Sequence, residues 1–202
     1  MTTYEALAKT VIINNKNRLV SYDRSLKLVG KGRSAFVFKI KATNVVIKIF
    51  FPDYTFIAKE EATIYQELEG IPYFPKLYDS GLNYIVIDYI KGLTLFECIT
   101  YGRIITSAHI KEIDRAISLA RNLGLNPSDI HLRNIFITRN NEIKLIDVAR
   151  FRQKKDCRQW ENLKKAYYQF YCKYYLPKKM PAFLLNITAA LYNRGLIPFY
   201  PR

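Results

Sequence analysis

The string S-D-I-H-L-R-N-I-F-I-T-R-N-N-E-I-K-L-I-D-V at residues 128–148 decides the fold. Two apolar runs, at residues 135–137 and 143–146, are separated by a polar turn at residues 139–142. This pattern is typical of two β-strands joined by a tight turn. Strands joined by so short a connection pair antiparallel, so the two segments that flank the hairpin are expected to meet at one end of it.

Three polar side chains stand in these flanking segments: Asp129, Asn134 and Asp147. The amide oxygen of Asn134 and the carboxylate of Asp147 are hard oxygen ligands of the kind that Mg²⁺ prefers. Asp129 would then orient an attacking hydroxyl group or accept its proton, as in phosphoryl transfer. An ordinary hairpin with an acid in each flanking loop fits these residues equally well. The choice therefore depends on the rest of the chain.

Composition indicates a folded protein with a substantial core. The chain has 202 residues, of which 50% are hydrophobic and 24% are charged. This length suits one large domain or two small lobes. No run reaches the roughly 18 unbroken apolar residues that a membrane helix needs, and residues 1–9 lack the apolar core of a signal peptide. We therefore expect a cytoplasmic protein with no membrane partner.

The cysteines Cys98, Cys157 and Cys172 are odd in number and lack C-x-x-C spacing. This argues against both a disulfide framework and a zinc site. We expect them to be reduced packing residues.

A glycine-containing loop is expected between two strands within residues 26–41. Gly30 and Gly32 precede Ala35, which stands in the place of a third glycine. The backbone of such a loop can lie close over a triphosphate. A plain hairpin turn explains a lone G-x-G-x-x-A as well.

Lys48 lies inside the apolar string V-V-I-K-I, which is expected to be a strand. A lysine inside a buried strand is unfavourable unless its ammonium group meets an anion. Residues 56–68 have a helical period, and Glu61 shares one face with Ile64 and Leu68 at i, i+3 and i+7. We therefore expect Glu61 to be the partner of Lys48. The alternative is a lysine on the solvent face of an alternating strand.

The middle of the chain is expected to contain a connector, a strand and a long helix. Residues 71–81 are a proline-bearing connector, and the apolar strand that follows stops at Lys91-Gly92. Thr106 or Ser107 caps a helix that ends at Gly124. Its apolar positions repeat every three or four residues: Ile110, Ile113, Ile117, Ala120 and Leu123.

Residues 156–175 are expected to form a helix with an aromatic stripe. The stripe consists of Trp160, Leu163, Tyr167, Phe170, Tyr171 and Tyr174. A nucleic-acid surface is possible in principle, but such a stripe is more often core, and we favour core. A last helix is expected over 181–193, with a short one near residues 4–9 at the other end of the chain.

Positive charge is concentrated in the last quarter of the chain. The protein carries a net charge of +15, and residues 150–202 hold 12 Lys and Arg against 2 acids, a net +10. Lysines stand there in pairs: Lys154 and Lys155, Lys164 and Lys165, Lys178 and Lys179. We expect them to form a strip that docks an acidic protein or RNA. A merely solvated basic face is the alternative.

The ordered set of motifs over residues 26–150 resembles the protein-kinase superfamily. That family has a glycine-rich loop, a strand lysine, a helix glutamate, H-R-D-x-x-x-x-N and D-F-G; here the last two strings are P-S-D-I-H-L-R-N and D-V-A. The chain is most similar to minimal atypical kinases. These are the short bacterial Ser/Thr kinase-like proteins, the RIO kinases and the small kinase of the tRNA-threonylcarbamoyladenosine complex.

The resemblance implies an α+β, bilobal fold with a β-rich N-lobe and a truncated, mostly helical C-lobe. The lobes would be residues 1–90 and 91–202, and the cofactors ATP and Mg²⁺. It implies catalytic roles for Lys48, Asp129 and Asn134, and metal binding by Asn134 and Asp147. It also implies that nucleotide is bound by the glycine-containing loop, by the Lys48–Glu61 pair and by the hinge at residues 88–90, the segment that joins the two lobes. These residues are Gly30, Lys31, Gly32, Arg33, Ser34, Lys48, Glu61, Asp88, Tyr89 and Ile90.

The sequence departs from the family pattern in three ways, which concern regulation and the acceptor. Pro127 and Ser128 replace His and Arg of H-R-D, and His131 stands where protein kinases usually have lysine. An A-P-E segment and the lower C-lobe are missing. The expected function is an ATP- and Mg²⁺-dependent Ser/Thr protein kinase that can phosphorylate itself. A small-molecule phosphotransferase, which often carries H-x-D-x-H, and a nucleotide-binding pseudokinase scaffold are the alternatives.

Overall fold

The computed structural model describes residues 3–155, 157–174 and 177–197. Contacts within the chain divide it into two compact units, residues 1–90 and residues 91–202. The first unit is rich in β-structure and the second is largely helical, so the chain has the mixed α+β composition of a small bilobal kinase-like fold. Each unit is described below by itself.

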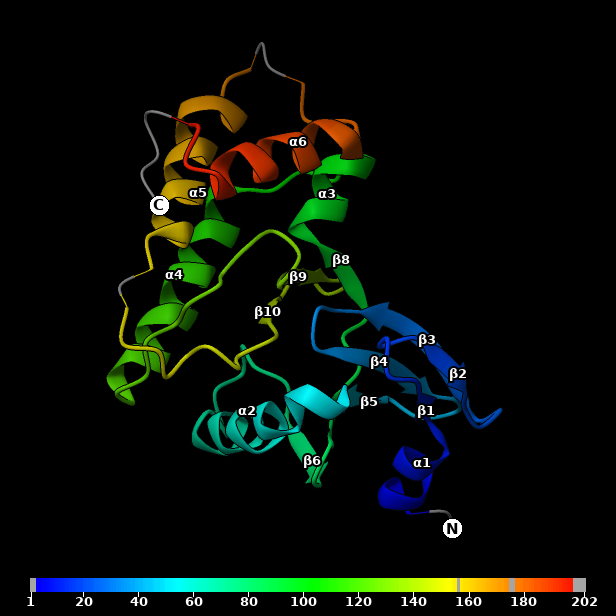
Figure 1. Ribbon diagram of the computed structural model, residues 1–202. Coiled ribbons are helices and arrows are strands. Elements are labelled where there is room, and N and C mark those ends of the chain that lie inside the picture. The colour runs from blue at the N-terminus through cyan, green and yellow to red at the C-terminus, as the bar shows by residue number, and fades with distance from the viewer. Residues whose placement is uncertain (1–2, 156, 175–176, 198–202) are drawn as a thin grey trace. The chain divides into compact units, whose positions relative to one another are not determined.

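A five-stranded antiparallel sheet forms the centre of the N-terminal unit (Figure 1). Its strand order is β3-β4-β5-β7-β6. The strands are β3 (Leu26–Lys31), β4 (Ala35–Ile40), β5 (Val45–Phe50), β6 (Leu77–Ser80) and β7 (Tyr84–Asp88). β5 lies in the middle of the sheet, where it pairs with both β4 and β7. The proline-bearing connector predicted at residues 71–81 therefore contains an edge strand, β6, that the sequence analysis did not anticipate.

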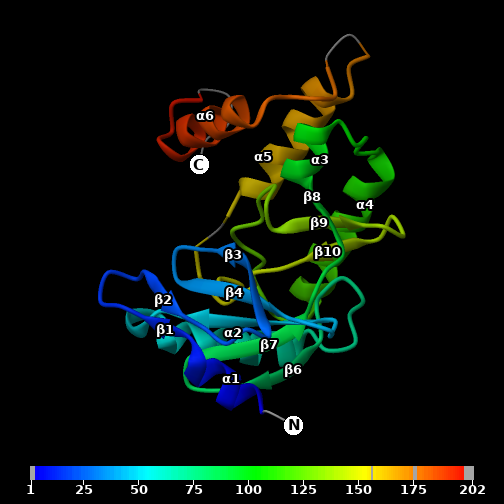
Figure 2. The same ribbon diagram turned by 90° about the vertical axis from the view of Figure 1, so that its right-hand side faces the viewer.

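The two faces of β5 have different partners because successive side chains of a strand point to opposite faces. Val45, Ile47 and Ile49 are buried in a hydrophobic core that also contains Leu7 of helix α1 (Tyr4–Thr10). Lys48 therefore belongs to the opposite face, which helix α2 (Thr55–Glu67) contacts. The short turn η1 (Pro52–Tyr54) leads into α2. Figure 2 shows α1 beside the small hairpin of β1 (Ile12–Ile13) and β2 (Leu19–Ser21).

The C-terminal unit contains the predicted hairpin. Strands β9 (Ile135–Thr138) and β10 (Ile143–Leu145) pair antiparallel, with Leu145 opposite Ile135. A third strand, β8 (Gly92–Thr94), extends the sheet on the side of β9. A Cβ atom at Gly92 would lie 2.5 Å from the carbonyl oxygen of Ile137. β8 and β9 can therefore approach this closely only with glycine at position 92.

Two capped helices follow β8. Helix α3 (Leu95–Tyr101) was not predicted, although Thr94 and Glu97 form the T-x-x-E capping box that marks a helix start. Helix α4 (Ser107–Asn122) begins at the N-cap Thr106, as predicted. Its predicted apolar face is buried except at the C-cap Leu123, which is 50% exposed. Leu123 lies after the end of the helix, next to Gly124 with its left-handed backbone, so it leaves the buried face. Ala116, which was not predicted, is buried on that face.

The aromatic stripe of the next helix is core only at its start. Trp160 in α5 (Gln159–Ala166) is buried, whereas Phe170 is 55% and Tyr174 95% exposed. After Ala166 the chain winds as a π-helix, η2 (Tyr167–Tyr171). A π-helix has more residues per turn than an α-helix, so it moves later positions off the predicted stripe. The ends of the predicted helix, Asp156 and Tyr175, lie outside the described residues.

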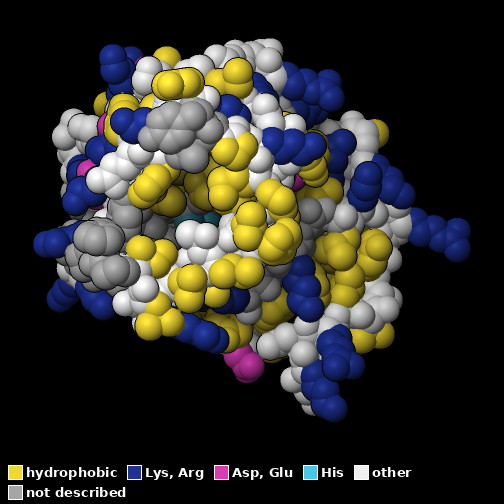
Figure 3. Space-filling model, turned by 90° about the horizontal axis from the view of Figure 1, so that it is seen from above, with side chains coloured by type: hydrophobic (Ala, Val, Ile, Leu, Met, Phe, Trp, Pro, Cys, Tyr) yellow, Lys and Arg dark blue, Asp and Glu magenta, His cyan; other side chains and the backbone are white. Residues whose placement is uncertain are grey.

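The last helix, α6 (Ala182–Asn193), agrees with the prediction for residues 181–193. It contacts α3, yet large apolar side chains along it stay exposed. Figure 3 shows hydrophobic side chains gathered on the face seen from above, with Lys and Arg side chains around them. The exposed apolar side chains of α6 include Phe183, Leu184, Ile187 and Leu191, each at least 40% exposed.

The cysteines fit the expectation of packing residues only in part. Cys98 is buried, Cys157 is half-buried and Cys172 is exposed. Burial raises the pKa of the Cys98 thiol. Among the residues that the structure describes, no helix is both long and apolar enough to cross a membrane.

Candidate functional site

An ion pair joins the middle strand of the N-terminal unit to helix α2. Lys48 Nζ lies 2.7 Å from Glu61 Oε2 and 3.0 Å from Oε1. The side chains are only 12% and 1% exposed. The alternation of β5 aims Lys48 at α2, and the helical period aims Glu61 back at the sheet. The predicted pairing is therefore present, and it holds a lysine ammonium group in a fixed position beside the sheet.

The glycine-containing loop closes the turn between β3 and β4. Gly32 N–H donates to the carbonyl oxygen of Ala35 at 2.9 Å. Neither glycine has a positive φ, and an added Cβ would meet nothing closer than 3.5 Å at Gly30 or 3.6 Å at Gly32. The described residues therefore do not require glycine at these two positions. Whether residues 30–34 bind a nucleotide stays a prediction.

The predicted hinge residues already have structural contacts within the unit. The Asp88 carboxylate accepts hydrogen bonds from Lys76 N–H and from the Tyr78 hydroxyl, each at 2.8 Å. The backbone N–H of Tyr89 donates to the carbonyl oxygen of Asn44 at 2.8 Å. The Asp88 side chain and the Tyr89 N–H thus hold the strands together. Adenine recognition by Asp88, Tyr89 and Ile90 remains a prediction that falls to their other backbone groups.

The hairpin of the C-terminal unit brings Asp129, Asn134 and Asp147 together at one of its ends. Asn134 is buried, and its Nδ2 donates to the carbonyl oxygen of Asp129 at 3.1 Å. Ile146 N–H donates to the carbonyl oxygen of Asn134 at 2.9 Å, so Asp147 follows directly beside Asn134. The amide nitrogen of Asn134 is thereby turned to the Asp129 loop. Its Oδ1 is left as the atom of that side chain that can bind a cation.

Asp129 and Asp147 share an uncommon backbone conformation. Both have φ of 60°, in the left-handed region that side chains other than glycine rarely adopt. Such conformations are unfavourable and concentrate at functional sites, where the surrounding structure imposes them. Two acids with this backbone at one end of a single hairpin are consistent with a functional role for both.

Arginine from the segment after Asp147 reaches the first acid. Arg150 Nε lies 3.6 Å from Asp129 Oδ2. Ser128, in the position of the family's arginine, is fully buried, and its hydroxyl donates to the carbonyl oxygen of Asn126 at 2.8 Å. The Ser128 side chain is thus engaged within its own loop. The cation beside Asp129 therefore comes from residue 150 instead.

Asn126 is a residue of this site that the sequence analysis missed. Its Nδ2 donates to the carbonyl oxygens of Gln153 at 2.8 Å and Lys155 at 3.1 Å, and its N–H donates to that of Phe151 at 2.6 Å. These bonds attach the segment after Asp147 to the loop that leads into Asp129. A single asparagine before proline gives no signal of such distant partners beyond its tendency to form turns.

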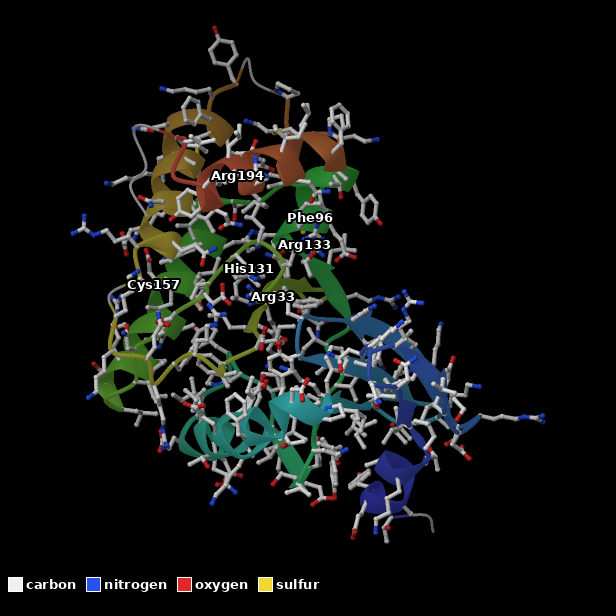
Figure 4. The ribbon with its side chains drawn as sticks, viewed as in Figure 1. Arg33, Phe96, His131, Arg133, Cys157 and Arg194 are labelled. Carbon is white, nitrogen blue, oxygen red and sulfur yellow. The ribbon has the colours of Figure 1, made fainter. Side chains whose placement is uncertain are left out.

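Arg133 is a second residue that was missed. Its guanidinium carbon lies 3.5 Å from the centroid of the Phe96 ring, and Nη2 donates to Asn186 Oδ1 at 2.9 Å. Arg133 N–H donates to Nδ1 of His131 at 3.2 Å, so the proton of a neutral His131 ring is on Nε2. Figure 4 shows Phe96, His131 and Arg133 lying together. The guanidinium is thus held in one place although Arg133 is exposed.

Two of the paired lysines are engaged inside the C-terminal unit. Lys164 Nζ lies 2.9 Å from Asp114 Oδ1 and 3.1 Å from Glu161 Oε2. Burial acts to lower the pKa of Lys164, but the hydrogen bonds to these acids outweigh it, and the pKa is raised. Lys178 donates to the carbonyl oxygens of Tyr171 and Lys173. Acids of the same unit thus pair with Lys164, and backbone carbonyl groups accept hydrogen bonds from Lys178. Docking of an acidic protein or RNA by the lysine pairs stays a prediction.

No group of three or more His, Cys, Asp or Glu side chains in the described part of the chain could hold a metal ion. Mg²⁺ does not need such a cage, because it commonly binds through one or two carboxylates together with substrate phosphates. The oxygen atoms of Asn134 and Asp147 suit that mode of binding. Their role as metal ligands stays a prediction.

Comparison with known proteins agrees with the order of these elements. No family model matches the chain. A Bacillus subtilis (strain 168) protein named "Putative serine/threonine-protein kinase YrzF" is 44% identical over 199 residues, which cover 96% of this chain and 93% of that protein. The 3-phosphoinositide-dependent protein kinase 1 of Arabidopsis thaliana is 29% identical over 133 residues, which cover 58% of this chain and 27% of that protein.

The first of these similarities extends over nearly the whole of both chains. The chain therefore belongs to the protein-kinase-like family. The α+β fold, the Lys48–Glu61 pair and the hairpin with Asp129, Asn134 and Asp147 are all present in the chain, and the roles of these residues stay predictions.

Proposed function

We propose that the protein is an ATP- and Mg²⁺-dependent serine/threonine protein kinase whose acceptors include its own chain. The observation that carries the proposal is the convergence of Asp129, Asn134 and Asp147 at one end of the β9–β10 hairpin. Two acids and an amide at such a position are the minimum that family members use to bind metal and to orient the acceptor hydroxyl. The Bacillus relative, whose name describes a serine/threonine kinase, supports the choice of acceptor.

The N-terminal unit would bind the nucleotide phosphates. Lys48, held by Glu61, places a positive charge where the α- and β-phosphates are expected. At Gly30 and Gly32 of the loop at residues 30–34, an added Cβ would meet its nearest neighbour at 3.5 and 3.6 Å, so no side chain shields the backbone there from a phosphate group. These observations fit ATP as the phosphoryl donor.

The C-terminal unit would bind the metal and the acceptor. Mg²⁺ bound with ATP supplies positive charge that offsets the charge of the phosphate oxygens. Asn134 and Asp147 would hold it through their side-chain oxygens. Asp129 would orient the acceptor hydroxyl and take its proton as the oxygen attacks the γ-phosphorus and the bond to the β-phosphate oxygen breaks.

A thermal unfolding experiment with ATP, with and without Mg²⁺, tests the nucleotide site. We expect ATP to stabilise the wild type more strongly when Mg²⁺ is present, because a ligand that binds only the folded state raises its stability. Asp147→Asn should remove the Mg²⁺-dependent part and abolish phosphoryl transfer. Equal transfer by wild type and Asp147→Ala would contradict the assigned role of Asp147. Binding of Mg²⁺ and ATP without any transfer would instead indicate a pseudokinase.

Phosphoryl transfer to a small molecule is a second candidate, and His131 favours it. The family members that phosphorylate small molecules often carry a histidine two residues after the catalytic aspartate, and His131 stands at this position. A radiolabel assay that offers both protein acceptors and a metabolite pool separates the two candidates. Label found only in small molecules would reject the protein-kinase proposal.

A further inference from the structure

Positive side chains dominate the end of the hairpin that carries Asp129. Residues 127–155 contain three acids, and two of them are Asp129 and Asp147. The third, Glu142, stands in the turn at the opposite end of the hairpin. In the two segments that flank this end of the hairpin, residues 127–134 and 146–155, the charged side chains other than the two functional acids are Arg133, Arg150, Arg152, Lys154 and Lys155.

Arg150 brings one of these charges directly to Asp129. The separation of 3.6 Å places its guanidinium beside the carboxylate that would orient the acceptor. Arg150 is 54% exposed at its side chain, so this pair contributes little to stability. An exposed cation at this position is suited to contact a negatively charged residue that neighbours the acceptor hydroxyl.

The hydrogen bonds of Asn126 fix the rest of the basic segment. They hold the backbone at Phe151, Gln153 and Lys155 against the loop that precedes Asp129. The exposed Lys154 and Lys155 are therefore presented from an anchored backbone and not from a loose tail. Anchoring before binding reduces the entropy that a partner's binding would otherwise cost.

Arg133 is held still by the Phe96 ring and Asn186. A guanidinium group has five N–H donors in a planar fork, and the hydrogen bond from Nη2 to Asn186 uses one of them. Stacking on an aromatic face is compatible with binding a carboxylate through the edge of the fork. Arg133 is thus a preorganised, exposed cation in the same loop as Asp129.

From this juxtaposition we infer that the acceptor is an acidic protein segment, a Ser or Thr flanked by Asp or Glu residues. Arg133 and Arg150 are the specificity-determining residues, with Lys154 and Lys155 extending the contact. The inference rests on the proposed kinase function and deepens it by naming the substrate class.

The test uses the full chain with ATP and Mg²⁺ and three acceptor peptides that differ only in the residues around one serine. The flanking residues are Asp and Glu, Asn and Gln, or Lys and Arg. We expect kcat/KM to be about tenfold higher for the acidic than for the neutral peptide, and lowest for the basic one, since several exposed charge pairs act together. The preference should shrink at high salt, which screens exposed charges.

Arg133→Glu should reduce the acidic preference and raise kcat/KM for the basic peptide. Arg139→Glu is the matched control, because it makes the same charge change in the exposed turn at the far end of the hairpin. Arg133→Gln removes the charge without reversing it, and should give an intermediate preference. Retention of the Mg²⁺-dependent stabilisation by ATP shows that each variant is folded.

The outcomes separate the inference from the function on which it rests. Equal kcat/KM for the three peptides would overturn the inference and leave the kinase function standing. Stabilisation by Mg²⁺ and ATP that does not depend on Asp147, with no peptide labelled, would overturn both. An RNA oligonucleotide of equal charge is tested as a competitor of the acidic peptide. If it displaced the peptide at concentrations well below the KM of the peptide, and if Arg133→Glu abolished this displacement, the surface would bind RNA and the inference would be wrong.

Discussion

The ammonium group of Lys48 lies 2.7 Å from the carboxylate of Glu61, between the middle strand of a sheet and the helix that covers it. Both side chains are nearly excluded from solvent. Removal of one member of a buried pair leaves an uncompensated charge, which is more unfavourable than removal of both. The pair therefore contributes to the stability of the N-terminal unit as well as to any nucleotide site.

We predict that Lys48→Met lowers the free energy of unfolding by about 3 kcal/mol. The double variant Lys48→Met with Glu61→Leu should recover a large part of this loss, because no charge then stays buried. Urea unfolding of these two variants and of the single variant Glu61→Leu gives the coupling energy between the two residues. Equal loss in the single and the double variant would show that the two residues do not depend on each other.

The left-handed backbone at Asp147 predicts an unusual order of stability among inactive variants. Asp147→Gly and Asp147→Ala both lack the carboxylate, but only glycine adopts φ of 60° without strain. We expect the glycine variant to be more stable than the alanine variant by about 1 kcal/mol. Thermal unfolding without nucleotide measures this difference, and neither variant should transfer phosphate. A more stable alanine variant would mean that the backbone conformation is not imposed on residue 147.

Substitution by alanine should reduce stability at Gly92 but not at Gly32. A Cβ at position 92 would lie 2.5 Å from Ile137 O, so Gly92→Ala should destabilise the C-terminal unit by about 2 kcal/mol. At position 32 the nearest atom would be 3.6 Å away, so Gly32→Ala should leave stability near that of the wild type.

The functional effect of Gly32→Ala is a separate measurement. If phosphate approaches the backbone here, the added methyl group should weaken ATP binding by about tenfold, or about 1.4 kcal/mol. The affinity for ATP is measured by calorimetry or from the melting temperature at increasing ATP concentrations. Unchanged affinity would place the phosphates away from this loop.

Tyr84 predicts a loss of stability at high pH. Burial, together with its hydrogen bond to Asp79 at 2.9 Å, raises the pKa of Tyr84 from 10.0 to about 12. Because the folded state holds this proton more tightly than the unfolded state, the stabilisation is complete below pH 10 and is lost as pH rises toward 12. Urea unfolding between these pH values, compared with Tyr84→Phe, isolates the contribution. The phenylalanine variant should have a shallower pH dependence.

The features that the sequence predicted correctly depend on short, regular periods. The position of Lys48 inside an apolar strand and the helical period of α2 were sufficient to pair Lys48 with Glu61. The hairpin and its flanking Asp129 and Asp147 followed from two apolar runs and one turn. In each case the partners are set by the geometry of one element or of two neighbouring elements.

The features that were missed depend on irregular backbone or on distant partners. Phe170 and Tyr174 are exposed because a π-helix replaces the α-helical period on which the stripe was drawn. Asn126 acts through backbone carbonyl groups 27 and 29 residues away, which no local pattern encodes. Helix α3 is different, because its Thr94 and Glu97 capping box was legible in the sequence and was overlooked.

The burial of Trp160 has a spectroscopic consequence. It is the single tryptophan of the chain, and its indole N–H donates to Asp114 Oδ1 at 2.7 Å inside the C-terminal unit. Tryptophan emission therefore reports on that unit alone, while far-ultraviolet circular dichroism reports on both. Any difference between melting curves recorded with the two signals isolates the unfolding of residues 1–90, the half of the protein that contains Lys48 and no tryptophan.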